Sequence, residues 1–159
     1  MMIYFVLNLL FAGAWVLVNN AYGITDFAIG FLLGLGCLWL TRPFGQDKSY
    51  FRRLKASVVL VVYFHYEMTI SVLRVAWEVL TPTPKSVPDI VHIPLDAKTD
   101  VEITLLANMV SLTPGTLSLD ITEEKSHLIV HAMFAQDHDA VISGIKNGLE
   151  KKLLEVTRG

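Results

Sequence analysis

The 159-residue sequence has few of the features that mark disulfide scaffolds, nucleic-acid-binding proteins or enzymes. Its single cysteine, Cys37, lies in an apolar run and cannot form an internal disulfide. The formal net charge is -2, and no basic stripe with interleaved aromatic residues is present, so we expect no nucleic-acid partner. Ser/His/Asp spacing, a phosphate-binding glycine-rich loop and an HExxH motif are also absent. We therefore predict no catalytic residues and no cofactor.

Charge is nearly absent from the first quarter of the chain. Residues 1–41 contain one charged side chain, that of Asp26, whereas residues 81–159 contain seven Lys or Arg and eleven Asp or Glu. No Lys or Arg precedes the first apolar run, and no convincing small-residue cleavage site ends it, so we expect this segment to be retained rather than removed as a signal peptide. The pattern predicts an N-terminal membrane part and a C-terminal soluble part.

The N-terminal part contains two apolar runs, 3–18 and 27–40, separated by a polar turn over 19–26. Each run is close to the ~20 residues that a helix needs to cross ~30 Å of hydrocarbon. We therefore predict a transmembrane helical hairpin of two spans over residues 1–41. In the second run, Gly30 and Gly34 form a GxxxG pattern, which indicates either a close helix contact or plain variety on a lipid-facing surface.

A basic loop follows the predicted hairpin over residues 42–55, where Asp47 is the only acidic residue. Cytoplasmic loops of membrane proteins carry an excess of Lys and Arg. We therefore place this loop and the N-terminus in the cytoplasm and the 19–26 turn outside. The cations of the loop are Arg42, Lys48, Arg52, Arg53 and Lys55.

Residues 56–80 form a third helical segment with one narrow polar stripe. On a helical projection the stripe covers a sector of about 60°. A complete third span would carry the soluble part to the side opposite the basic loop, so we favour an amphipathic helix at the membrane surface or against a partner, with three spans as the alternative. The stripe consists of Arg53, Glu67, Ser71, Arg74 and Glu78.

The polar stripe has two possible roles. It can form a relay or a subunit contact in which Glu67 pairs with Arg74, or a solvated face on which Arg74 pairs with Glu78 one turn away. Asp26 and Glu67 are the carboxylates of the membrane part that could carry ions. Because Asp26 lies at a turn and Glu67 in the third helix, structural roles are favoured for both.

The soluble part follows a proline-containing linker over residues 81–87 and occupies residues 88–159. We expect a short strand over 90–95, then a helix that opens with the capping box Thr99 to Glu102. Two strands of a hairpin and a last helix that begins at Asp137 complete a small α+β domain in the order β-α-β-β-α. In this order the first helix can cross over between parallel strands.

The most specific stretch is NMVSLTPGTLSLD, from Asn108 to Asp120. Pro114 cannot continue a helix and Gly115 can adopt positive φ, so the chain turns there. Beyond the turn, Leu117, Leu119 and Ile121 alternate with polar residues, which is typical of a half-buried strand. We interpret the stretch as a structural hinge. Its hydroxyl groups, on Ser111, Thr113 and Thr116, are expected to cap the helix end or to meet a neighbouring subunit.

A cluster of histidines and aspartates is the one candidate for a metal or acid-base site. His127 and His131 lie on one face of a predicted strand but about 13 Å apart, too far to bind one ion. Asp137 and Asp139 lie where a helix start favours negative charge. We therefore favour helix capping and solvated histidines, His138 included, over a metal site.

The two N-terminal apolar helices, the basic loop, the segment with Glu67 and Arg74 and the motif NMVSLTPGTLSLDI resemble the E subunit of the Mrp (Mnh, Pha) multisubunit cation/proton antiporters of bacteria. The resemblance covers nearly the whole chain, and SLTPGTL is its strongest motif. It marks a family signature and expected subunit contact at Asn108, Ser111, Leu112, Thr113, Pro114, Gly115, Thr116 and Leu117.

The resemblance implies a non-catalytic accessory subunit in the bacterial cell membrane, with the C-terminal domain in the cytoplasm. Its partners would be the lipid bilayer and the other antiporter subunits, which exchange Na⁺ or K⁺ for protons. A membrane-anchored sensor with a ligand-binding domain and a metal-dependent membrane enzyme remain as alternatives. The identity of the cation and of the contacted subunits is left open.

Overall fold

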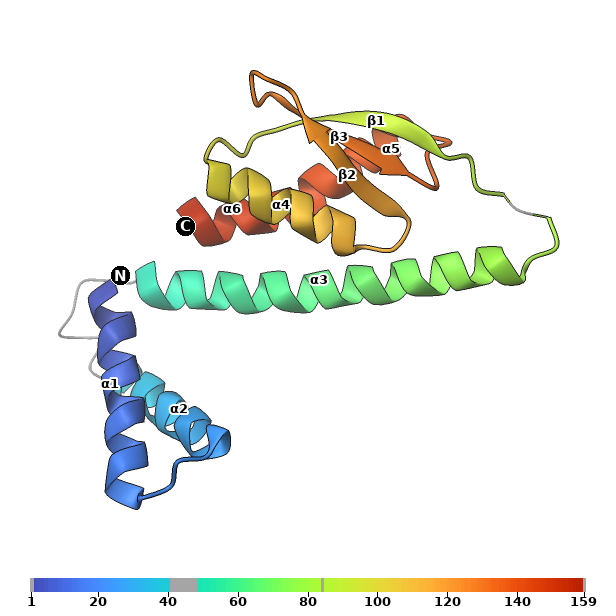
Figure 1. Cartoon of the computed structure of the whole chain (residues 1–159). Helices are drawn as coiled ribbons and strands as arrows, with labels where there is room; N and C mark the ends of the chain where they lie inside the picture. Colours follow the sequence, from blue (N-terminus) through green and yellow to red (C-terminus); the bar gives the residue numbers. More distant parts are fainter. Residues whose placement is uncertain (1, 41–48, 84, 159) are drawn as a thin grey trace. The chain divides into compact units, whose positions relative to one another are not determined.

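The computed structural model divides into two compact units, a helical one over Met1–Arg52 and one of helices and strands over Arg53–Gly159 (Figure 1). The prediction of a helical N-terminal region followed by a small α+β unit is therefore confirmed. The predicted loop cations Arg42 and Lys48 lie outside the described residues. The described residues are 2–40, 49–83 and 85–158.

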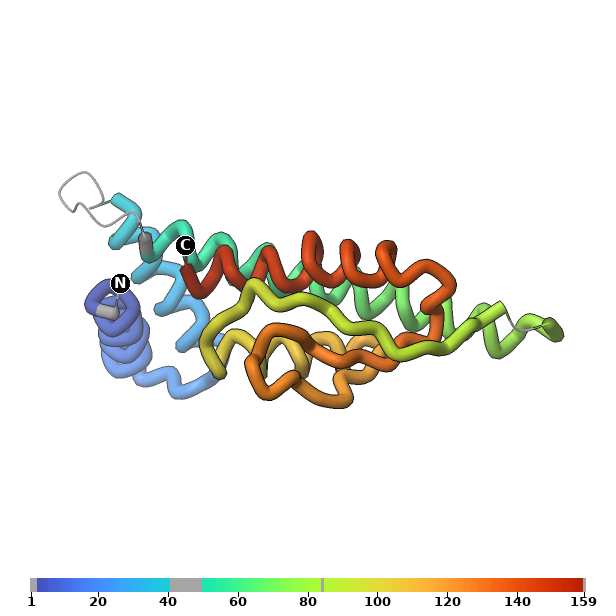
Figure 2. The backbone as a smooth tube through the Cα atoms, turned by 90° about the horizontal axis from the view of Figure 1, so that it is seen from above, coloured from blue at the N-terminus to red at the C-terminus, as the bar shows by residue number. Residues whose placement is uncertain are grey.

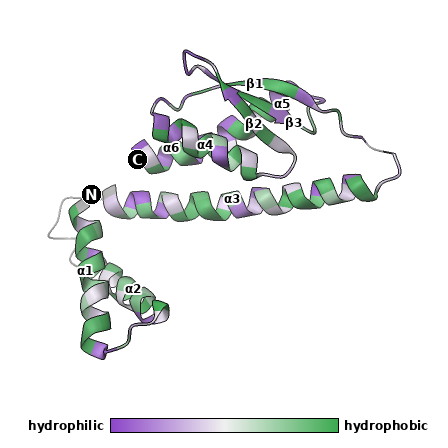
Figure 3. Cartoon of the chain, in the orientation of Figure 1, coloured by the Kyte–Doolittle hydropathy of each residue, from purple (hydrophilic) through white to green (hydrophobic). Residues whose placement is uncertain are grey.

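The first unit contains a helical hairpin of α1 (Met2–Asn19) and α2 (Ile24–Leu40). Both helices are green along most of their length in Figure 3, because nearly every residue is apolar. The chain reverses between them at Asn20, whose φ of 51° lies in the left-handed region that asparagine tolerates. The large apolar side chains of the hairpin point outward, and examples with more than 60% exposure are Ile3, Leu10, Val18, Ile24 and Leu32.

The two helices of the hairpin pack through small residues. A Cβ atom added to Gly34 would lie 2.3 Å from the Oδ1 atom of Asn8, and one added to Gly30 would lie 2.8 Å from the Cβ atom of Trp15. Only glycine at these two positions allows the backbones of α1 and α2 to approach so closely. The GxxxG pattern therefore marks a real helix contact.

Helix α3 (Ser49–Leu80) is longer than the predicted segment and begins seven residues earlier. The early start has a local cause, because Arg and Lys are good helix formers and Tyr50 and Leu54 continue the apolar spacing. By length and composition alone, Tyr50–Leu80 is the one helix of the described residues that is long and apolar enough to cross a membrane. The apolar parts of α1 and α2, Ile3–Asn19 and Ile24–Leu40, are shorter.

The sheet of the second unit has the strand order β1-β3-β2, and both outer strands pair antiparallel with β3. β1 and β2 therefore run in the same direction, and α4 crosses over between them as expected. The capping box at the start of α4 is present: the Thr99 side chain accepts from the Glu102 N–H. The elements are β1 (Asp89–Pro94), α4 (Asp100–Leu112), β2 (Thr116–Ile121) and β3 (His127–Ala132).

The C-terminal segment was predicted as one helix but contains a π-helical turn. It consists of α5 (His138–Ile145), the turn η2 (Lys146–Glu150) and α6 (Lys151–Arg158). A π turn inserts one residue into a helix and shifts the face that follows. Here the shift brings Leu149, Glu150 and Leu153 all into buried positions.

The second unit is built in layers. Helices α4, α5 and α6 cover one face of the sheet, and α3 lies along the far side of these helices, as both views show (Figures 1 and 2). Leu60, Tyr63 and Phe64 of α3 pack against the core. Buried core residues include Val91, Ile93, Leu106, Val110, Leu128, Val130, Ile145, Leu149 and Leu153.

Candidate functional site

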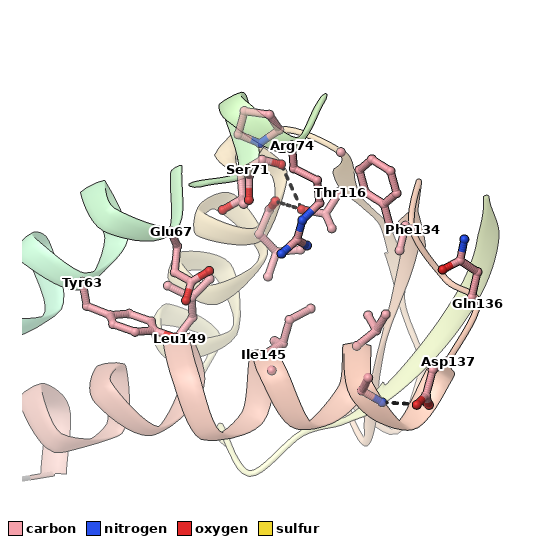
Figure 4. Close-up of a pocket in the computed structure, with 18 of the residues that line it drawn as sticks. Tyr63, Glu67, Ser71, Arg74, Thr116, Phe134, Gln136, Asp137, Ile145 and Leu149 are labelled. Atoms are coloured by element: carbon pink, nitrogen blue, oxygen red, sulfur yellow. Dashed lines mark hydrogen bonds between the residues drawn. The ribbon is translucent and has the colours of Figure 1, made fainter. Parts of the chain in front are cut away.

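A cavity of about 680 Å³ lies in the second unit between α3 and the Thr113-Pro-Gly turn. The polar stripe of α3 forms one wall and α5 with the following turn forms the opposite wall (Figure 4). The structure thus brings together two sets of residues that the sequence singled out separately. They are Glu67, Ser71 and Arg74 from the stripe, and Thr113, Pro114, Gly115 and Thr116 from the signature.

The turn at the cavity is formed by backbone geometry and internal hydrogen bonds. The Thr113 hydroxyl donates to the Met109 carbonyl at 2.9 Å, and the Thr116 hydroxyl donates to the Val110 carbonyl at 2.7 Å. Gly115 has a φ of +88°, a conformation that side chains strongly disfavour. The two hydroxyl groups therefore satisfy carbonyls at the end of α4, as the capping alternative predicted.

The remaining polar groups of the signature tie α4 to β2. The Ser118 N–H donates to the Ser111 hydroxyl at 3.0 Å, and the Ser118 hydroxyl donates to the Ala107 carbonyl at 2.9 Å. Asn108 is the exception, because it donates to the Thr104 carbonyl within α4, on the exposed side of the helix. Leu112 and Leu117 are exposed by 64% and 50%. These two leucines are the large apolar side chains of the signature that are exposed among the described residues.

The predicted core face of β2 is wrong for two of its three apolar residues. Leu117 and Leu119 are about half exposed, whereas Ser118 faces α4. A β-bulge between Ser118 and Asp120 then shifts the register, so that Ile121 packs against the core. Hydrogen bonding of Ser118 to the helix sets the face of the strand, and the bulge reverses the alternation.

Neither expected ion pair of the α3 stripe is present among the described residues. Glu78 is only 8% exposed and accepts hydrogen bonds from the backbone N–H groups of Lys85 and Ser86. It therefore fixes the linker at the end of α3. The Arg74 guanidinium points into the cavity, with its central carbon 5.9 Å from the ring centre of Phe134.

The histidines are dispersed rather than gathered. His127 Nδ1 lies 2.9 Å from the Ser126 hydroxyl, and His138 Nε2 lies 3.0 Å from Asp89 Oδ2. Asp137 caps α5 by accepting from the Ala140 N–H at 3.1 Å. Within the described ranges, no group of three or more His, Cys, Asp or Glu side chains is arranged to hold a metal ion.

A buried carboxylate in the π turn was missed at the sequence level. Glu150 is 1% exposed and accepts from the N–H groups of Asp96 and Ala97 at 2.7 and 3.0 Å. It also lies 3.0 Å from Lys146 Nζ. Burial alone would lower the pKa of Lys146, but hydrogen bonds to Asp96 and Glu150 outweigh it and raise that pKa. The i,i+4 spacing of Lys146 and Glu150 was the available signal.

Comparison with known proteins gives the family. Residues 8–156 match the family model described as Na+/H+ ion antiporter subunit. The chain is 37% identical over 152 residues to the Na(+)/H(+) antiporter E subunit of Alkalihalophilus pseudofirmus, with 96% of each chain covered. The chain belongs to the E-subunit family of Na+/H+ antiporters. Within this family it is also 32% identical to the E subunit of Bacillus subtilis over 96% of each chain, and 32% identical to the E1 subunit of Staphylococcus haemolyticus over 98% of each.

Two solved structures share the fold. A chain of the Mrp complex from Dietzia sp. DQ12-45-1b has a TM-score of 0.51 and 24% identity, covering 64% of this chain and 96% of its own length. A chain of the membrane-bound sulfane sulfur reductase, an archaeal respiratory membrane complex, has a TM-score of 0.55 and 22% identity, covering 94% and 96%. The architecture of this antiporter subunit thus recurs in two kinds of membrane complex.

Proposed function

We propose that this antiporter subunit is a non-catalytic accessory component of a multisubunit cation/proton antiporter, needed for the assembly or stability of the complex. Family membership supports the antiporter role. The accessory role is supported by one observation above all: the hydroxyl groups of the signature turn hydrogen-bond backbone groups of α4 and β2, which is a structural role. Such a turn stabilises a domain that other subunits can contact.

The hairpin is proposed to span the membrane. Its helices have 18 and 17 residues, which at ~1.5 Å per residue gives lengths of about 27 and 26 Å, close to the ~30 Å hydrocarbon core. The pair buries small residues and exposes large apolar ones, an arrangement that suits a lipid solvent. Asp26, its charged residue, lies in the first turn of α2. At that position it offers no path for ions through the hairpin.

Helix α3 is proposed to lie in the membrane surface rather than to cross the bilayer. All three charged residues between 56 and 80 (Glu67, Arg74 and Glu78) lie on the face toward the α+β domain. Over residues 56–80 the opposite face carries no Asp, Glu, Lys or Arg, and its exposed residues include Val58, Val62, Leu73, Trp77 and Leu80. On this face His65 Nδ1 and the Thr69 hydroxyl contact backbone carbonyls of α3 at 2.8 and 2.7 Å. A face of this kind suits the boundary between lipid and water.

The packing of the domain on α3 argues against a third span. Lys152 Nζ lies 3.9 Å from the ring centre of Tyr63, near the middle of α3. If α3 crossed the bilayer, this ammonium and the domain around it would enter hydrocarbon, at a cost of several kcal/mol per charge. A surface position keeps the domain in water and the apolar face of α3 in lipid. The Lys and Arg excess of residues 42–55 supports a cytoplasmic position for the domain.

A membrane-anchored ligand-binding protein is the second candidate function, and the 680 Å³ cavity favours it. Pockets that hold small molecules typically have volumes of ~300–1,000 Å³. A cavity of this kind and an accessory role are compatible, because a bound molecule can stabilise a subunit that also contacts others.

Extraction of the tagged full-length chain in mild detergent tests the accessory role. We expect the chain to migrate on a native gel with a large complex, and deletion of the chain to abolish antiport in everted membrane vesicles. Migration as a lone species near its own 17.7 kDa, together with antiport that survives the deletion, would contradict the proposal.

A further inference from the structure

Two opposite charges of α3 face the cavity without an ion-pair partner among the described residues. Glu67 and Arg74 both line the cavity, and neither takes part in an ion pair there. They are seven residues apart, which corresponds to about 10.5 Å along the helix axis. Both side chains extend into the space between α3 and α5 (Figure 4), with Ser71 between them on the stripe. Along α3 the cavity therefore has a cationic position at Arg74 and an anionic position at Glu67.

The cationic position is built to receive an anion. The Arg74 guanidinium lies over the ring of Phe134, which holds the guanidinium plane but leaves its N–H groups available to a ligand. Lys85 and Gln136 also line the cavity, where the Gln136 amide donates to the Lys85 carbonyl. Asp137 lies beside Gln136 in the lining, and its carboxylate accepts from the Ala140 N–H (Figure 4). The Arg74 guanidinium suits a phosphate, because several N–H donors can reach its oxygens at once.

The anionic position offers a carboxylate close to an aromatic hydroxyl. Glu67 and Tyr63 are one turn apart on α3, and both line the cavity near Leu149. A carboxylate in a partly enclosed site is the usual partner for an ammonium group.

We propose that the cavity binds the head group of a phospholipid, with its phosphate at Arg74 and its ammonium at Glu67. The proposal rests on the surface position of α3 proposed above, since a helix whose far face lies in lipid holds this cavity at the depth of the head groups. The volume of 680 Å³ is sufficient for a head group, and the acyl chains remain with the bilayer beside α3. The lipid would fasten the domain to the membrane.

Gly144 provides a way to close the cavity without disturbing its charges. It lies on α5 in the wall opposite Arg74, and no atom lies within 4 Å of a Cβ added there. A leucine at this position extends into open space and also favours the helix more than glycine does. The charge and the volume of the cavity can therefore be varied independently. Arg52→Gln is the matched control for Arg74→Gln, because it removes the same charge from the exposed start of α3, away from the cavity lining.

The test is native mass spectrometry of the full-length chain in detergent with added phosphatidylethanolamine or phosphatidylglycerol, which lacks an ammonium. We expect wild type to retain the former about tenfold better. Arg74→Gln and Gly144→Leu should each lower retention of phosphatidylethanolamine by about tenfold, Glu67→Gln should abolish the preference, and Arg52→Gln should change neither. Equal retention of both lipids by wild type, unaffected by Arg74→Gln, would overturn the proposal.

Two further measurements distinguish recognition of the head group from binding of the acyl chains, and the lipid site from the accessory function. Glycerophosphoethanolamine, the head group without acyl chains, competes if the cavity recognises the head group itself, and a failure to compete even at millimolar concentration would contradict that recognition. Native gels of the same variants report assembly independently. An intact complex with unselective lipid binding leaves the accessory function standing and overturns only the lipid site. Loss of assembly in Arg74→Gln with unchanged lipid retention would instead assign the cavity to a neighbouring subunit.

Discussion

Among single residues, the buried carboxylate Glu102 holds together two ends of the α+β domain. It is 3% exposed and accepts from the N–H groups of Lys98 and Thr99, from the Thr157 hydroxyl and from the Arg158 guanidinium. The Arg158 hydrogen bonds, followed by that of Thr157, hold the pKa of Glu102 far below its usual range. One side chain therefore ties the start of α4 to the end of α6.

Glu102→Gln should lower the free energy of unfolding of the domain by about 2 kcal/mol, because the Arg158 guanidinium loses its charged partner while some hydrogen bonds remain. Hydrogen exchange of α4 and α6 amides in the full-length chain measures the effect. Exposed Glu155, substituted by Gln, serves as the control and should change nothing. Equal exchange in both variants would contradict this role for Glu102.

The same substitution should change the pH dependence of stability. The pKa of Glu102 is lower in the folded chain than in the unfolded chain, so its contribution is complete above the unfolded pKa of about 4.3 and disappears as the pH falls below it. Wild type should therefore lose stability between pH 5 and pH 3 more steeply than Glu102→Gln. Parallel curves would exclude this carboxylate as the cause.

Among the helices and strands, the contact between α1 and α2 depends on Gly34. Gly34→Val should destabilise the hairpin by about 1–3 kcal/mol, because the added atoms overlap Asn8 and Phe11. Gly36→Val is the matched control, since no atom lies within 4 Å of a Cβ at Gly36. Thermal unfolding in detergent, followed by the fluorescence of Trp15 in a chain without the other two tryptophans, should show a lower midpoint for Gly34→Val alone.

The sequence predicted the kind and order of the elements well where local chemistry decides them. Thr99 with Glu102, Asp137 and the Pro114–Gly115 turn each carry their own signal for a helix end or a reversal. The prediction of the buried face of β2 failed because Ser118 makes a hydrogen bond to α4 that the alternation of residues cannot reveal. The bulge that follows then reverses the alternation. The π turn was not predicted for a similar reason: Glu150 is buried because it accepts hydrogen bonds from the backbone of Asp96 and Ala97, which are distant in the sequence.

The candidate site was predictable in its parts but not as a cavity. The stripe on α3 and the signature turn are about forty residues apart, and only packing of α3 against the domain brings them together. The i,i+4 rule suggested that Arg74 pairs with Glu78, yet two backbone N–H groups of the linker bind Glu78 instead. Charge patterns along a helix identify a face, whereas the partner of each charge depends on the tertiary structure.

The molecule as a whole combines an apolar helical hairpin with an α+β domain whose core packs against α3. The domain alone is small, and its core is completed by Leu60, Tyr63 and Phe64 of α3. These three side chains enlarge the core of a domain of about seventy residues, a size at which a core on its own gives little stability. The proposed function and the proposed lipid site both depend on where α3 lies in the membrane.

Site-specific labelling of intact cells is the sharpest test of that position. In a chain with Cys37→Ala, single cysteines replace Tyr22 in the hairpin turn and Glu124 in the turn between β2 and β3, both of which are exposed. If the hairpin spans the membrane and α3 lies on its cytoplasmic surface, Tyr22→Cys faces the outside and Glu124→Cys faces the cytoplasm. A membrane-impermeant maleimide should then label Tyr22→Cys in intact cells and Glu124→Cys only after lysis. Labelling of Glu124→Cys in intact cells would mean that α3 crosses the membrane, which contradicts its proposed place at the surface.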